Sequence, residues 1–179
     1  FEKIVALRPG ANTILLEAID ASGNIAKRTI TIVRETVEAQ AAPEQAPTIP
    51  GQRYAVIIGI SAYRDERLNL RYTVNDAQGF YDVLADPNYG GIPKDNIKLL
   101  LSEEATTVNV KKAIGTWLSR KATEDDTVII YYSGHGAPEG NQTYWVTYDA
   151  DIDDLYSTAL NNDEITNMLD RVRAKRVIT

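Results

Sequence analysis

The chain has 179 residues, of which 44% are apolar, enough for one domain of ordinary size with a real core plus a smaller unit. Its formal net charge of -6 argues against binding to nucleic acid, because proteins that bind phosphate backbones concentrate Lys and Arg. No apolar run reaches the roughly 18 residues that cross a bilayer, and the absence of cysteine excludes disulfides and thiolate zinc sites within these residues.

Residues 1–34 alternate apolar and polar side chains, which is the pattern of half-buried β-strands. The turn-rich sequence DASGN at residues 20–24 divides them, so an antiparallel hairpin is expected. Two strands alone are only marginally stable in water. The hairpin must therefore pack on the rest of the chain or be the remnant of a β-sandwich, and we favour the remnant.

The alternation stops at residue 35, where the composition changes. Residues 35–52 are rich in Ala, Glu and Gln and contain Pro43, Pro47 and Pro50 ahead of Gly51. This composition is typical of an extended or flexible linker. The predicted organisation is a hairpin over 1–34, a linker over 35–52 and a larger domain over 53–179.

The larger domain alternates predicted strands and helices. Apolar runs predict buried strands at 54–60, 96–101 and 127–132, with a candidate fourth strand at 143–148 and the start of another at 176–179. Apolar residues at helical spacing predict helices over 74–84, 110–118 and 165–172, and Thr106 or Thr107 is a candidate cap for the second. This order indicates an α/β fold in which an open, mainly parallel sheet lies between helices.

The single histidine, His135, follows the strand predicted at 127–132, within the sequence YYSGHG. Open α/β sheets place their chemistry beyond the carboxyl ends of the strands. Gly134 and Gly136 flank the imidazole and leave it accessible. Two interpretations remain open: a turn histidine that only makes hydrogen bonds, and a general base or acid.

The sequence argues against three other kinds of site around this histidine. Ser133 is the nearest hydroxyl, but no G-x-S-x-G elbow presents it as a nucleophile. One histidine with scattered carboxylates lacks the paired ligands of a zinc site. No G-x-x-x-x-G-K-[ST] sequence is present to hold phosphates. An imidazole that transfers protons therefore needs a partner of another kind.

Five segments together resemble the caspase-fold cysteine peptidases, most closely bacterial metacaspase-type members, the orthocaspases. They are YAVIIGISAY at 54–63, NDA at 75–77 after LNL at 68–70, IIYYSGHG at 129–136, YDAD at 148–151 and AKRVI at 174–178. The resemblance spans residues 53–179 and implies a caspase-like three-layer sandwich with cysteine endopeptidase activity and no required cofactor. In this family the catalytic cysteine follows the strand after the one that bears the histidine. The resemblance thus implies a nucleophile beyond Thr179, in a remaining C-terminal part that completes the fold, and these 179 residues alone are expected to be inert.

The resemblance also implies roles for individual residues. His135 would act as general base and acid, and the backbone N–H of Gly136 would bind the oxyanion. Asp76 and Ser133 would line the S1 pocket, so protein or peptide substrates with Arg or Lys at P1 are expected. For Asp76 a second interpretation remains open, because a carboxylate in the first turn of a helix is favoured by the helix dipole alone.

An acidic run, formed by Asp149, Asp151, Asp153 and Asp154, invites a calcium interpretation, because hard cations take several carboxylates at once. It is not an EF-hand, since Asp154 stands where that loop needs glycine. Several metacaspases are activated by calcium through acidic clusters in this part of the fold. A calcium site and a solvated loop both remain open.

Two alternatives to an active peptidase also remain open. One is a catalytically dead caspase-like interaction module, and the other is a surface or interaction protein whose α/β part is structural. The hairpin resembles the closing strands of immunoglobulin-like modules in bacterial surface and exported proteins. That resemblance leaves export or the cell surface of a bacterium open as the compartment, with the cytoplasm as the alternative.

Overall fold

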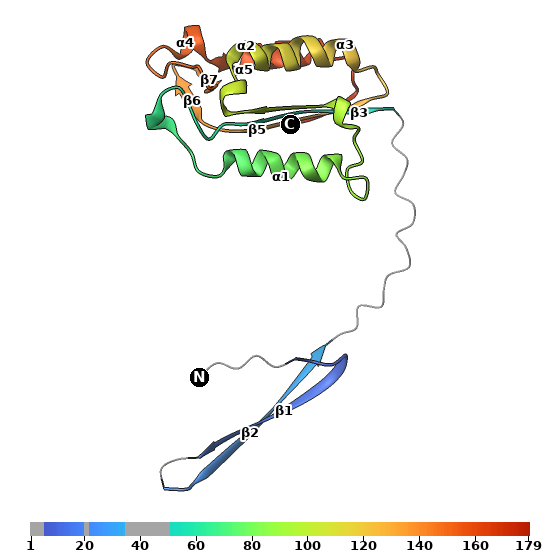
Figure 1. Cartoon of the computed structure of the whole chain (residues 1–179), viewed down its shortest axis with the longest axis vertical. Helices are drawn as coiled ribbons and strands as arrows, with labels where there is room; N and C mark the ends of the chain where they lie inside the picture. Colours follow the sequence, from blue (N-terminus) through green and yellow to red (C-terminus); the bar gives the residue numbers. More distant parts are fainter. Residues whose placement is uncertain (1–5, 20–21, 35–50) are drawn as a thin grey trace. The chain divides into compact units, whose positions relative to one another are not determined.

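The structure, a computed structural model, describes residues 6–19, 22–34 and 51–179 (Figure 1). The chain divides into two compact units, residues 1–48 and 49–179. Most of the predicted linker, residues 35–50, lies outside the described residues, so the linker stays a prediction.

The first unit contains the predicted antiparallel hairpin. Strand β1 (Gly10–Ile19) pairs with strand β2 (Ile25–Arg34) along their whole length, which confirms the hairpin. No described residue of either strand is buried, and large apolar side chains such as Leu15, Ile19 and Val33 are exposed. The pair therefore holds no core of its own, and its origin in an immunoglobulin-like sandwich stays a prediction.

The second unit is built on a parallel sheet of four strands in the order β4-β3-β5-β9. The strands are β3 (Arg53–Gly59), β4 (Ile97–Leu101), β5 (Thr127–Ser133) and β9 (Arg176–Ile178). Residues 54–59 of β3 are all buried, because helices cover both faces of this strand. The parallel sheet predicted from the apolar runs is confirmed.

Helices form a layer on each face of this sheet (Figure 1). Helix α1 (Thr73–Ala85) covers one face, where Ala77 and Phe80 pack with Ile57 of β3. The other face carries α5 (Asn162–Leu169) and a long helix over 107–121, which consists of α2 (Thr107–Lys111), a π-helical segment (Lys112–Leu118) and α3 (Ser119–Lys121). The three-layer α/β prediction is thus confirmed.

Local chemistry sets where the long helix begins and how it packs. The Thr106 hydroxyl accepts a hydrogen bond of 3.2 Å from the backbone N–H of Asn109, so Thr106 is the N-cap. Gly115 lies against Met168 of α5, and a Cβ at this glycine would be 3.1 Å from the Met168 sulfur. A glycine at this position lets the two helices approach closely. None of the helices in the described ranges has the length and apolarity that crossing a bilayer requires.

Shorter elements connect these layers. They are the 3₁₀ turns Glu66–Leu68, Lys94–Asn96 and Ser102–Glu104, the helix α4 (Leu155–Thr158), and the strands β6 (Gly136–Glu139), β7 (Gln142–Trp145) and β8 (Leu160–Asn161). The three strands form a separate antiparallel sheet in the order β6-β7-β8.

The strand expected at 143–148 therefore differs from the prediction. It ends at Trp145 and lies outside the parallel sheet. Only a tight turn, at Gly140 and Asn141, separates β6 from β7, and Gly140 has a φ of 58°. So short a connection can join only antiparallel neighbours, because a parallel pair needs a crossover of a dozen residues or more.

The carboxylate of Asp126 is buried next to the start of β3. Asp126 accepts hydrogen bonds from the backbone N–H groups of Gln52 (2.6 Å) and Thr123 (2.7 Å) and from the Thr123 hydroxyl (2.9 Å). Burial raises the pKa of Asp126, but these hydrogen bonds outweigh burial and the pKa is lowered. The Asp126 contribution to stability is thus fully present above about pH 4 and is lost as the pH falls through the lowered pKa.

Replacing Asp126 with alanine is expected to lower the free energy of unfolding by about 2 kcal/mol at pH 7, because two backbone donors lose a charged acceptor. Urea unfolding followed by circular dichroism at pH 7 and pH 3 checks this. The difference between the two proteins should be smaller at pH 3. An equal difference at both pH values would show that the charge of Asp126 does not matter.

Candidate active site

His135 lies at the carboxyl edge of the parallel sheet, as the sequence predicts. Strand β5, in the middle of that sheet, ends at Ser133, and Gly134 and His135 connect it to β6. The carbonyl of His135 accepts a 2.9 Å hydrogen bond from the N–H of Val146, which ties the segment to the end of β7. The half-buried imidazole therefore sits at the junction of the two sheets.

One hydrogen bond defines the protonation of the ring. Nε2 of His135 lies 2.9 Å from the backbone carbonyl oxygen of Leu68. A carbonyl oxygen only accepts hydrogen bonds, so Nε2 must carry a proton. In the neutral ring the other nitrogen, Nδ1, is then the basic one, and it can accept a proton from a reacting group.

The Leu68 carbonyl is itself held in place by its loop. Leu68 ends the 3₁₀ turn Glu66–Leu68, which is capped by the Asp65 side chain. The Asn69 side chain accepts a 2.8 Å hydrogen bond from the N–H of Tyr63, and the N–H of Leu70 donates to the carbonyl of Ser61 at 2.8 Å. These bonds anchor the loop after β3 and so orient the acceptor of the histidine.

Two tyrosines, the buried Tyr63 and the half-buried Tyr132, hold the backbone of His135 through their hydroxyls. The Tyr63 hydroxyl accepts a 2.8 Å hydrogen bond from the N–H of His135, and the two rings lie 5.3 Å apart. The Tyr132 hydroxyl donates to the carbonyl of His135 at 2.6 Å, and its ring stacks on Trp145 at 4.5 Å. We call Tyr63 and Tyr132 the tyrosine pair. Burial raises the pKa of both hydroxyls, strongly so for Tyr132, so the pair stays neutral at physiological pH.

The two glycines beside His135 serve different needs. A Cβ at Gly134 would lie 2.8 Å from the hydroxyls of both Tyr63 and Tyr132, closer than real Cβ contacts. A Cβ at Gly136 would meet only the carbonyl oxygen of Tyr144, at 3.7 Å. Gly134 is therefore required by the tyrosine pair, whereas Gly136 is exposed at the start of β6, and its oxyanion role stays a prediction.

Asp76 and Ser133 lie at this same end of the sheet. Ser133 pairs with Gly59 across β5 and β3, and a Cβ at Gly59 would lie 2.7 Å from the carbonyl oxygen of Thr73, in the first turn of α1. Asp76 belongs to that turn and is exposed. Its carboxylate has no hydrogen bond or ion pair with any described residue. Their shared role in an S1 pocket stays a prediction.

Three of the four aspartates of the acidic run each accept a hydrogen bond from a different backbone N–H group. Asp149 accepts from the N–H of Thr107 at 2.8 Å, Asp151 from that of Asp153 at 3.0 Å, and Asp154 from that of Ser157 at 3.2 Å. Within the described ranges, no three His, Cys, Asp or Glu side chains converge as a metal site would require. Calcium binding by this loop stays a prediction.

Sequence reasoning missed the Leu68 carbonyl and the tyrosine pair. A backbone carbonyl carries no side-chain signal, so nothing in the sequence marks Leu68. The tyrosine pair does leave a signal: Tyr132 is the last residue but one of β5, Tyr63 follows the end of β3 in the next loop, and Gly134 leaves space for both hydroxyls.

Comparison with known proteins places this geometry in a family. Metacaspase-1 of Arabidopsis thaliana is 33% identical over 129 residues, which is 69% of this chain and 32% of that protein. Metacaspase-1 of Saccharomyces cerevisiae (strain YJM789) is 32% identical over 108 residues, which is 57% of this chain and 24% of that protein. Metacaspase-1A of Aspergillus oryzae is 30% identical over 116 residues, which is 62% of this chain and 25% of that protein.

These relatives confirm the metacaspase part of the predicted resemblance, while the bacterial type stays a prediction. The chain spans roughly a quarter to a third of the length of the relatives named here. The caspase-domain family matches residues 52–178, which cover the parallel sheet, both helical layers and the His135 edge. The chain therefore belongs to the caspase-domain (peptidase C14) family.

Proposed function

We propose that this chain is the histidine-bearing part of a cysteine endopeptidase that cleaves protein or peptide substrates after Arg or Lys. The observation that carries the proposal is the hydrogen bond between Nε2 of His135 and the Leu68 carbonyl, which leaves Nδ1 as the basic nitrogen at the edge of the sheet. Membership in the caspase-domain family and the similarity to metacaspases support it.

The thiol would come from residues that follow Thr179, since the 179 residues contain no cysteine. Strand β9 runs parallel to β5, with Val177 opposite Val128 and Ile178 opposite Ile129. If the chain continues in this register, residues about three to five positions after Thr179 stand opposite Ser133 to His135. Parallel neighbours are roughly 4.8 Å apart, so a cysteine there would come within reach of the imidazole.

The chemistry needs one proton to move twice. Nδ1 of His135 would take the proton of the thiol, and the thiolate sulfur would attack the scissile carbonyl carbon. The imidazolium would then donate that proton to the leaving amine as the acyl-enzyme forms, and water would release the acid in a second step. The exposed N–H of Gly136 is our candidate donor to the oxyanion.

The full-length protein, with the residues after Thr179 included, tests the proposal. Matched reporter peptides with Arg, Lys or Asp at P1 should be cleaved after Arg and Lys, and alkylation of the thiol should abolish cleavage. Cleavage after Asp would contradict the specificity. A full-length protein with Ser, Ala or Tyr in place of the thiol, and no cleavage of any peptide, would instead support the catalytically dead interaction module.

Asp76 offers a sharper test of specificity. Asp76→Asn is expected to lower kcat/KM for Arg and Lys substrates about 10- to 100-fold, because the cationic side chain of the substrate loses its negatively charged partner. Asp82→Asn is the matched control, since it removes the same charge from the exposed part of the same helix. Equal kcat/KM values for the two variants would exclude Asp76 from the S1 pocket.

A further inference from the structure

A hollow lies outside the candidate active site, beside the edge strand β4. It is a groove of about 730 Å³ between the edge strand β4 and the long helix over 107–121, and it shares no lining residue with the His135 site. We call it the β4 groove. Its lining from β4 is Lys98 and Leu100, and its lining from the helix is a single stripe that runs from Asn109 to Lys121.

Four cations and no acidic side chain line this groove. They are Lys98, Lys112, Arg120 and Lys121. None of the four forms an ion pair with a described residue, although the chain as a whole carries a net charge of -6. The groove is therefore a local concentration of unpaired positive charge on an acidic protein, which favours an anionic ligand.

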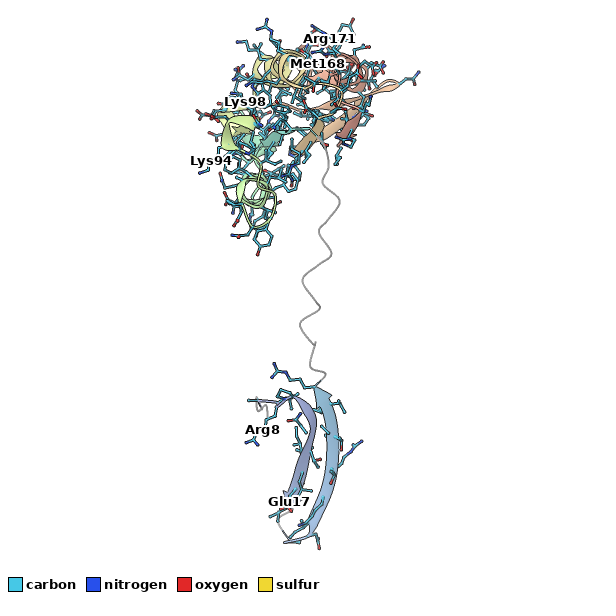
Figure 2. The ribbon with its side chains drawn as sticks, turned by 90° about the vertical axis from the view of Figure 1, so that its right-hand side faces the viewer. Arg8, Glu17, Lys94, Lys98, Met168 and Arg171 are labelled. Atoms are coloured by element: carbon cyan, nitrogen blue, oxygen red, sulfur yellow. The ribbon has the colours of Figure 1, made fainter. Side chains whose placement is uncertain are left out.

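The floor of the groove is apolar. Its apolar lining is Leu100 from β4 and Ala113 and Trp117 from the helix. Trp117 is half-buried. The ammonium group of Lys98 lies 5.5 Å from the centre of the tryptophan ring, which is the range of a cation–π interaction. Figure 2 shows Lys98 on the β4 side of the second unit, apart from Met168 and Arg171. An apolar floor under charged walls fits a ligand that carries both apolar and acidic groups.

The backbone of β4 adds a third element of recognition. β4 is the last strand on its side of the sheet, so no strand within the described ranges pairs with its outer edge. An edge strand of this kind can accept an extended peptide, whose backbone continues the sheet. A nucleic acid would use the cations but could not extend the sheet through backbone hydrogen bonds.

From these three observations we infer that the β4 groove binds an extended acidic segment of a partner protein. The backbone of the segment adds to the edge of β4, its apolar side chains cover Trp117 and Leu100, and its carboxylates pair with the four cations. The inference does not depend on the proposed peptidase activity, because the groove and the His135 site lie at different edges of the second unit.

The probe is a blocked nine-residue peptide in which Glu alternates with Val and Leu, titrated into the uniformly ¹⁵N-labelled chain of 179 residues. Saturable shifts are expected in the amide signals of residues 97–101 and in the indole signal of Trp117. Raising the ionic strength should weaken binding, because the cations are exposed. Matched peptides with Gln or Lys in place of Glu should bind more weakly or not at all.

Two double variants distinguish the effect of charges in the β4 groove from the effect of net charge. Lys112→Glu with Arg120→Glu should weaken binding of the Glu peptide at least about tenfold. Lys94→Glu with Arg171→Glu makes the same change of net charge outside the groove, at positions labelled in Figure 2, and should change affinity less than about twofold.

Four results of the peptide titrations would overturn the inference. They are no saturable shift at millimolar peptide, equal weakening by the two double variants, equal binding of the Lys peptide, and shifts confined to residues outside the groove. A single-stranded oligonucleotide that displaces the Glu peptide and binds more tightly would overturn it in favour of a nucleic-acid ligand.

Discussion

Replacing His135 with alanine in the full-length protein is expected to lower kcat for peptide cleavage by roughly 10³- to 10⁶-fold. The reason is that no other imidazole exists within these 179 residues to accept the thiol proton or to protonate the leaving amine. Steady-state cleavage of Arg and Lys reporter peptides measures the effect. Stability should change much less, because the tyrosine pair binds the backbone of residue 135 and not its ring nitrogens.

His135→Asn separates proton transfer from structure. An asparagine amide can still donate a hydrogen bond toward the Leu68 carbonyl, but it cannot accept and release a proton near neutral pH. Both variants should therefore be inactive while their unfolding transitions stay close to that of the parent. A His135→Asn protein that keeps more than about a tenth of the parent kcat would remove His135 from the proton transfer.

Gly134→Ala is expected to cause the largest loss of stability among substitutions at the candidate site, about 1–3 kcal/mol. The new Cβ would lie 2.8 Å from the hydroxyls of Tyr63 and Tyr132, so one of the phenols must move. Moving either one breaks a hydrogen bond to the backbone of His135. Urea unfolding of the 179-residue chain measures the free energy directly.

Gly136→Ala is the matched control, two residues further along the same segment. Its Cβ would meet a single atom at 3.7 Å, which is an ordinary contact. Its free energy of unfolding should therefore stay within about 0.5 kcal/mol of the parent. If the two variants lose equal stability, the strain comes from the loss of glycine flexibility and not from the tyrosine pair.

The sequence predicted the parallel sheet because helices cover both faces of its inner strands. A strand buried on both faces must be apolar at every position, as residues 54–58 of β3 are, and such a run is easy to recognise. Once β5 was placed in that sheet, the position of His135 at its carboxyl edge followed from chain direction alone. The sequence also narrowed the N-cap to Thr106 or Thr107, because capping is a local effect, and the structure identifies Thr106.

Other features depend on contacts between segments far apart in the sequence. The Leu68 carbonyl reaches His135 across 67 residues, and Tyr63 reaches it across 72. Contacts of this kind leave no periodic pattern in the sequence. The sequence therefore identified the histidine as a candidate but could not indicate which ring nitrogen carries the proton. The strand predicted at 143–148 lies outside the parallel sheet for a related reason. Its apolar residues indicate that it is buried, but they do not indicate which strand it pairs with.

The most direct test of the account is the tautomer of His135 in solution. The chain has a single histidine, so ¹⁵N-detected NMR of an untagged sample gives one imidazole to assign. In the neutral ring we expect a proton on Nε2 and a proton-free Nδ1. A ring protonated on Nδ1, or one that exchanges rapidly between tautomers, would contradict the hydrogen bond to Leu68 and with it the proposed proton transfer.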